Sequence, residues 1–348
     1  MAMTIVESTR AVIGGVDTHL DVDVAAAVDA VGGVLGVESF ATNEQGYRRL
    51  IEWLRALGPV MLVGVEGTGS YGAGLTRSLQ QAGVSVVEVD RPNRQARHRA
   101  GKSDPLDAIA AARAALSGTA NGAPKSRTGN VEAIRVLMVA RRSAVEERIT
   151  TLNQLRHLCI TAPEPIRRRF GGLTPAALAK RAAALKPRRS DPLRYSTLLA
   201  IRTLGRRVLY LRDETKELNS VLRPLIQTTA PGLLGVFGVG YDTAAKLLIA
   251  AGDNPQRLRS EPAWAHLCGV APLPASSGKT VRHRLNRGGD RQANSALYHV
   301  MITRLSHHEP TKAYVARRLA DGKTLGETAR MLKRYIAREV YKQLPRPA

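Results

Sequence analysis

Short runs of apolar residues, separated by turns and charges, dominate the beginning of the chain. Three runs of strand length lie at residues 11–19, 22–28 and 31–40. Their length and their short connections predict a meander of three antiparallel strands. The first of these strands ends in an acid, Asp17.

The next part of the chain alternates between helical and strand patterns. We predict helices over 43–57 and 71–82, strands over 60–65 and 84–89, and a further helix that begins at Asp104. Glu66 directly follows the strand over 60–65. A three-stranded meander that leads into such alternation is the element order of an RNase H-like α/β fold.

The segment G-K-S-D-P-L-D-A at 101–108 marks the start of the helix at Asp104. We predict Asp104 as its N-cap, Pro105 as its first helical residue and Asp107 one turn in. Two acids spaced by three residues share one face of a helix. On their own they could simply stabilise the helix dipole.

The acids at the strand ends indicate a second possible role for these helical acids, which is metal binding. Asp17, Glu66, Asp104 and Asp107 would lie on adjacent edges of the predicted fold and could together hold Mg²⁺, which prefers oxygen ligands and supports phosphoryl transfer. A cap or turn role remains the alternative for each. We interpret Asp21, Asp23 and Asp29 as surface acids because they lack such partners.

Long arginine-rich helices follow from Val131. Between residues 201 and 225, apolar positions recur at alternating spacings of three and four, which is typical of a coiled coil, either within the chain or between protomers. The positions of this seam, in which only Thr215 breaks the apolar pattern, are Ile201, Leu204, Val208, Leu211, Thr215, Leu218, Leu222 and Leu225.

The charge of the chain indicates what kind of partner it binds. The 348 residues include 52 Lys and Arg against 29 Asp and Glu, a net charge of +23, which favours a nucleic-acid partner. No apolar run approaches the roughly 20 residues of a membrane span, and the first ten residues lack a signal-peptide core. We therefore predict a cytoplasmic protein without a membrane partner.

Two segments are candidates for phosphate contact. The basic connector between the long helices carries Arg167, Arg168, Arg169, Arg188 and Arg189. The segment over 233–248 is similar to a helix-hairpin-helix, in which Gly238 and Gly240 would let backbone amides approach a phosphate. A plain glycine-rich turn explains that segment nearly as well.

A glycine- and proline-rich loop over 269–294 contains the tandem serines Ser276 and Ser277. Serines in such loops are usually turn formers. Here five cations accompany them, and a hydroxyl among cations suits attack on a phosphodiester. These cations are Lys279, Arg282, Arg284, Arg287 and Arg291.

Four segments in this order resemble the DEDD transposases of insertion sequences, the insertion sequence 110 family, which includes Piv-type DNA invertases. They are V-D-T-H at Asp17, V-E-G-T-G-S-Y at Glu66, K-S-D-P-L-D-A, and S-S-G-K-T with R-H-R-L-N-R-G-G-D. The resemblance covers nearly the whole chain. It implies that Asp17, Glu66, Asp104 and Asp107 bind the metal and that a C-terminal serine is the nucleophile. Ser277 matches best, and Ser276 is the alternative.

The resemblance also implies an architecture and partners. We expect a RuvC-like domain over 1–125, a helical coiled-coil domain over 126–228 and a mainly α transposase domain over 229–348. The expected function is DNA recombination through a composite site of carboxylates and serine, with donor and target DNA, a structured bridge RNA as guide, and a dimer or tetramer. A RuvC-like nuclease and a non-catalytic nucleic-acid-binding protein are the alternatives.

Overall fold

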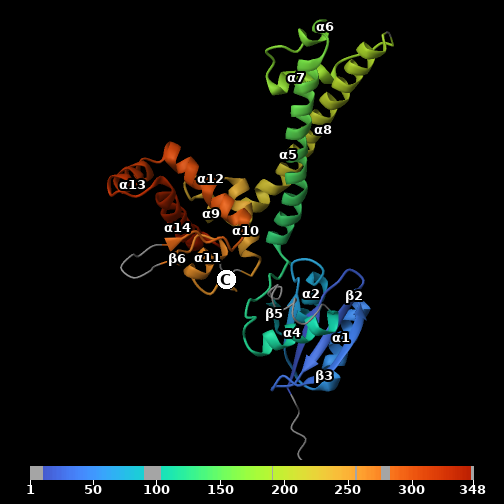
Figure 1. The fold of residues 1–348 in the computed structure, drawn as a ribbon, viewed down its shortest axis with the longest axis vertical. Helices are drawn as coiled ribbons and strands as arrows, with labels where there is room; N and C mark the ends of the chain where they lie inside the picture. Colours follow the sequence, from blue (N-terminus) through green and yellow to red (C-terminus); the bar gives the residue numbers. More distant parts are fainter. Residues whose placement is uncertain (1–10, 90–102, 190, 255–256, 276–282, 346–348) are drawn as a thin grey trace, which may run out of the picture. The chain divides into compact units, whose positions relative to one another are not determined.

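The computed structural model of the protein describes residues 11–89, 103–189, 191–254, 257–275 and 283–345 (Figure 1). The described residues fall into two compact units. The first contains the chain up to Thr128 together with Gly252–Arg259, and the second contains Gly129–Ala251 and the chain from Ser260 onward.

A mixed five-stranded sheet forms the centre of the first unit. Its strand order is β3-β2-β1-β4-β5, in which β1, β2 and β3 are antiparallel neighbours while β4 and β5 run parallel to β1. The meander and the following alternation are thus confirmed. The strands are β1 (Val12–Asp17), β2 (Val22–Val28), β3 (Val34–Ala41), β4 (Val60–Glu66) and β5 (Val86–Val89).

Helices cover both faces of this sheet because both faces are apolar. Helices α1 (Glu44–Leu57) and α2 (Ala73–Gln81) pack on the face that carries Val12 and Val16 of β1. Helix α4 (Asp104–Leu116) packs on the opposite face, which carries Ile13. Successive side chains of a strand point to opposite faces, so Gly15 and Asp17 share the α4 face with Ile13.

Two paired glycines let α4 lie directly on the sheet. Gly15 of β1 is opposite Gly64 of β4. A Cβ atom on Gly15 would lie 2.1 Å from the backbone nitrogen of Ala112, and one on Gly64 would lie 2.7 Å from the carbonyl oxygen of Ala111. Only the absence of both side chains allows this approach, which brings the start of α4 toward the strand-end acids.

We expect Gly15→Ala to destabilise the first unit by about 1–3 kcal/mol, because the added methyl group meets helix backbone that cannot turn aside. Gly122→Ala is the control, since its Cβ would come no closer than 4.0 Å to Glu88. Thermal unfolding followed by circular dichroism measures both. Equal midpoints for Gly15→Ala and the wild type would show that α4 does not depend on this contact.

Two long helices, α5 (Asn130–Thr161) and α8 (Pro192–Thr229), lie side by side in the second unit (Figure 1). The seam positions Ile201, Val208, Leu211 and Leu222 are buried, and the other four are half-buried. Much of the apolar seam of α8 is therefore covered by packing within the same chain.

The connector between α5 and α8 is more ordered than a basic linker. It forms α6 (Glu164–Arg167) and α7 (Pro175–Ala183), and α7 packs on α8. A Cβ on Gly205 of α8 would lie 2.6 Å from the Cβ of Ala182. Cys159 is buried in the same apolar cluster.

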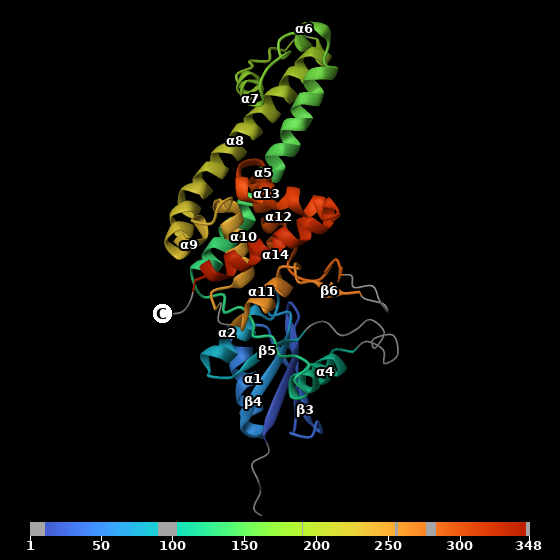
Figure 2. The same cartoon turned by 90° about the vertical axis from the view of Figure 1, so that its left-hand side faces the viewer.

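The remainder of the second unit is mainly helical, and α12 packs against both α10 and α14 (Figure 2). A two-stranded hairpin, β6 (Leu273–Pro274) with β7 (His283–Arg284), interrupts the helices. Within the described residues, no helix combines the length and apolar composition of a membrane span. The helices are α9 (Pro231–Leu234), α10 (Tyr241–Ala251), α11 (Glu261–Leu267), α12 (Arg291–His307), α13 (Glu309–Ala320) and α14 (Leu325–Gln343).

Candidate active site

The candidate site lies where the ends of β1 and β4 meet the first turn of α4. Asp17 is the last residue of β1 and Glu66 the last of β4. Since Val16 pairs with Val65, the two acids follow at neighbouring positions on parallel strands. Each lies two residues beyond one of the glycines that contact α4, so both belong to the α4 face. Both are buried, with exposures of 6% and 8%.

Helix α4 contributes the other two acids from its first turn. Asp107 is buried, whereas Asp104 is about half exposed. The prediction of Asp104 as N-cap is wrong by one residue: Ser103 has the extended backbone of a cap, and its carbonyl oxygen accepts the Leu106 and Asp107 amides at 3.0 and 3.1 Å. Asp104 is therefore the first helical residue.

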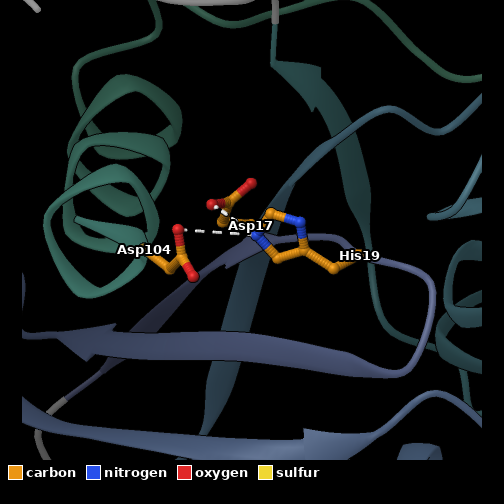
Figure 3. A group of neighbouring side chains, drawn as sticks. All are labelled: Asp17, His19 and Asp104. Carbon is orange, nitrogen blue, oxygen red and sulfur yellow. Dashed lines mark hydrogen bonds and ion pairs between the residues drawn. The ribbon is translucent and has the colours of Figure 1, made fainter. Parts of the chain in front are cut away.

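A histidine that the sequence reasoning missed completes the cluster (Figure 3). The Nε2 atom of His19 lies 3.2 Å from Oδ2 of Asp17 and 3.6 Å from Oδ1 of Asp104. In the described part of the chain, these three residues each offer one ligand atom within 4.8 Å of the others. The only sequence signal was the position of His19, two residues after the strand-end acid.

Burial and neighbouring acids act together on Asp17. Burial raises the pKa of its carboxyl group, the charges of Asp107 and Asp104 raise it further, and His19 opposes them. Crowded carboxylates in a desolvated place are typical of a site that receives a cation or a proton. The structure thus brings Asp17, Asp104 and Asp107 into electrostatic contact.

Glu66 is held near this cluster through the backbone. The hydroxyl group of Thr18 donates a hydrogen bond to the carbonyl oxygen of Glu66 at 2.9 Å, which ties the exit of β1 to the end of β4. Glu66 does not belong to the three-residue cluster defined above for the described residues. Its place on the same strand edge and face makes it a candidate for a further oxygen ligand.

The donor set suits a divalent cation. Four carboxylates supply the oxygen ligands that Mg²⁺ prefers, and they come from elements whose packing is fixed by Gly15 and Gly64. Asp17, Asp104, Asp107 and Glu66 would hold the ion, with His19 beside two of them. When bound, the ion would stabilise negative charge during phosphoryl transfer.

Asp23 does not lie on the surface, and the prediction that placed it there is wrong. It is fully buried in β2. One carboxylate oxygen accepts the backbone N–H of His19 at 3.1 Å, while Oδ2 has no hydrogen-bond partner among the described residues. Burial raises its pKa to about 6. The alternation of a strand that is covered on both faces leaves no solvent face for this acid.

The raised pKa of Asp23 predicts a stability change with pH. Below pH 4 the group is protonated in both states, and between pH 4 and 6 only the unfolded state ionises fully, so stability falls as pH rises. The loss amounts to about 3 kcal/mol at most. We expect Asp23→Asn to reduce this difference in unfolding free energy between pH 4 and pH 7.

The measurement is denaturant unfolding in EDTA, followed by Trp53 fluorescence in a common Trp264→Phe background. Asp21→Asn is the matched control, because Asp21 is exposed and two residues away. A pH profile of Asp23→Asn parallel to that of the control would contradict the prediction.

In the second unit, the paired strands β6 and β7 flank the serine loop. Strands β6 and β7 pair Leu273 with Arg284 and Pro274 with His283, so they bracket the serines. Ser276, Ser277, Lys279 and Arg282 lie outside the described residues. Arg284, Arg287 and Arg291 are exposed on the following segment and on α12.

Close backbone packing fixes the end of this loop. A Cβ on Gly289, which has a φ of 91°, would lie 2.5 Å from the carbonyl oxygen of Leu267. Asp290 then caps α12 by accepting the Gln292 and Ala293 amides at 2.8 and 3.0 Å. The G-G-D part of the sequence block therefore anchors the loop to the helices of the second unit.

The other predicted phosphate contacts have mixed surroundings. Arg167, Arg168, Arg169, Arg188 and Arg189 are exposed, but Arg167 and Arg168 both pair with Glu164. Gly238 has a φ of 85°. The amide of Gly240 already donates to the hydroxyl oxygen of Thr243 at 2.9 Å.

Comparison with known proteins gives matches in both units. Residues 14–160 match the family model for DEDD transposases of IS110 elements, described as a transposase. Residues 231–316 match the model described as the transposase IS116/IS110/IS902 family. An uncharacterized 43.6 kDa protein of insertion element IS110 from Streptomyces coelicolor is 29% identical over 132 residues. This alignment covers 36% of the chain and 32% of the relative, less than half of either.

Proposed function

Since the chain belongs to the IS110 family of insertion-sequence transposases, we propose that it cuts and rejoins DNA with Mg²⁺-binding carboxylates and a nucleophilic serine. The observation that carries this proposal is the convergence of Asp17, Asp104 and Asp107 at the end of β1, with Glu66 on the adjacent strand end. The mixed sheet and the helices on both its faces support an RNase H-like, RuvC-like fold for the first unit.

The acids of the first unit have a binding and positioning role in this proposal. Asp17, Glu66, Asp104 and Asp107 would hold the cation, which when bound would offset charge on the scissile phosphate. His19 orients the Asp17 and Asp104 carboxylates through its Nε2 atom. Asp23 holds the turn that carries His19 by accepting its backbone amide.

The serine of the second unit supplies the nucleophile. The hydroxyl oxygen of Ser277, or of Ser276, gives up its proton and bonds to the phosphorus of a phosphodiester. The bond from that phosphorus to the ester oxygen of the neighbouring nucleotide breaks, and this oxygen takes up a proton and leaves as a hydroxyl group. The phosphate stays bonded to the serine, so no phosphodiester bond is lost to water. A hydroxyl group of the second DNA end can then attack this phosphorus, which joins the strands and releases the serine hydroxyl. Arg284, Arg287 and Arg291 offset the charge on the phosphate.

The remaining parts of the proposal concern partners. The net charge of +23 supports binding to donor and target DNA and to a structured guide RNA. The packed seam between α5 and α8 supports a coiled-coil arm, and a dimer or tetramer is the expected assembly. The α9–α10 segment serves as a helix-hairpin-helix-like contact to the DNA backbone.

One experiment separates this function from its alternatives. The full chain is incubated with Mg²⁺, supercoiled DNA carrying the element with its flanks, and RNA transcribed from the non-coding flanks, and denaturing gels are examined for protein joined to DNA. A covalent adduct with rejoined products supports the serine recombinase. Cut DNA without an adduct supports a RuvC-like nuclease, and binding without cleavage supports a non-catalytic protein.

A further inference from the structure

A cationic groove lies between α5 and α8, far along the chain from the acids and from the serine loop. It has a volume of about 420 Å³. In the described part of the chain its lining contains four cations, three neutral polar residues and no acid: Arg148, Arg212, Lys216, Arg223, Thr215, Asn219 and Ser220. We call it the α5/α8 groove.

The spacing of its residues makes the groove an extended surface. Its α8 residues run from Arg212 to Arg223 in steps of three and four, so they follow one helix face. Eleven residues of helix correspond to about 16 Å. A nucleic-acid strand carries a phosphate every few Å along this length, whereas a small anion would occupy only part of it.

Arg148 gives the groove an unsatisfied donor. Its Nε atom is buried and has no hydrogen-bond partner among the described residues. Burying a guanidinium N–H without an acceptor is costly, and a phosphate oxygen is a strong acceptor for it. Arg223, by contrast, is already stacked over the ring of Tyr241, 5.5 Å from its centroid, which holds its charge in place.

A second groove on the same two helices shows the usual compensation. It is lined by Glu147, Arg207 and Glu214 among others, and Arg207 pairs with Glu147 at 2.8 Å. The two helices therefore supply acids where cations need neutralising. Within the described residues, the α5/α8 groove is lined by none, and of its cations Arg212 pairs with Asp213, which lies outside the lining, at 2.9 Å.

We propose that the α5/α8 groove binds the phosphodiester backbone of a nucleic acid, through Arg148, Lys216 and Arg223, without reading its sequence. This inference rests on the proposed function and deepens it by assigning the helical arm to nucleic-acid binding. Phosphate contacts of this kind position a nucleic acid and carry no base information.

The test compares two double variants of the full chain that each remove two positive charges. Arg148→Gln with Lys216→Gln alters the groove. Arg207→Gln with Lys312→Gln is the matched control, because each of its cations is paired with an acid. Affinity for a labelled 30-base-pair DNA duplex and for a single-stranded RNA is measured by anisotropy in EDTA at several salt concentrations.

We expect the groove variant to flatten the slope of log K against log salt by about 1.8 for the duplex or about 1.4 for the RNA. At 0.15 M salt this corresponds to a loss of about ten- to thirtyfold in affinity. The nucleic acid whose salt slope changes, the duplex or the RNA, is the one that the groove binds. A change in both slopes supports a site that accepts DNA or RNA. Lys216→Gln alone, at an exposed position, should give about half the effect.

The inference would be overturned if the groove variant and the control had equal salt slopes for both the DNA duplex and the RNA. It would also be overturned by a change in sedimenting mass without a change in slope, because that result would assign the groove to a second copy of the chain. Circular dichroism checks that both variants fold. Wild-type protein that binds neither nucleic acid would overturn the proposed function itself, a separate result.

Discussion

Replacing Asp17 with asparagine is expected to lower DNA cleavage in Mg²⁺ by about a thousandfold or more, because a shared cation site that loses one charged ligand loses most of its function. The pKa of Asp17 responds to burial and to the neighbouring Asp104, Asp107 and His19. The asparagine keeps the shape of the side chain and removes its charge. Glu66→Gln, Asp104→Asn and Asp107→Asn are expected to act in the same direction.

Cleavage is measured on gels with the DNA and RNA described above, and cation binding is measured separately. Mg²⁺ should raise the thermal midpoint of the wild type, because a ligand of the folded state stabilises it, and this rise should vanish in Asp17→Asn. Asp21→Asn, an exposed acid of the same turn, is the control. Full activity in two or more of the four variants would refute the metal site.

Ser277→Ala is expected to eliminate strand transfer and the covalent protein–DNA adduct together, while nucleic-acid binding persists. The hydroxyl oxygen is the atom that forms the bond to phosphorus, and alanine has none. Binding depends on cations that the substitution leaves in place. Ser276→Ala should have a small effect if Ser277 is the nucleophile, and the two results would be exchanged if Ser276 is.

The adduct is detected by denaturing gel electrophoresis with end-labelled DNA, and binding is measured by anisotropy. The double variant Ser276→Ala, Ser277→Ala is the decisive sample. If it still cuts and rejoins DNA in Mg²⁺, serine chemistry is excluded and the metal-dependent nuclease takes its place. Cutting without rejoining by this variant would likewise assign cleavage to the acids of the first unit.

Local patterns in the sequence were sufficient for the elements of the first unit. Apolar runs of strand length predicted β1, β2 and β4, and the helical pattern over 43–57 predicted α1, whose N-cap is Asn43. Asp17 and Glu66, which end β1 and β4, could be identified from the sequence because burying a charge next to an apolar strand costs free energy, so an acid at that position indicates a function.

Contacts between distant segments could not be predicted in the same way. Nothing along the sequence distinguishes Gly15 from other strand residues, and only the fold places the backbone of Ala112 against it. The burial of Asp23 cannot be predicted because one strand gives no information about which helices cover its two faces. His19 became part of the site only when the turn after β1 was folded beside α4.

The sequence by itself therefore determined the helices and strands of the first unit, the candidate acids and the basic character of the chain, since these depend on neighbours along the backbone. Tertiary structure alone decided that Asp23 is buried, that His19 joins Asp17 and Asp104, and that Arg148 and Arg223 line one groove. The physical reason is that burial, pKa and ion pairing depend on which atoms meet in space, and packing brings together residues such as Asp17 and Asp104 that are far apart in the chain.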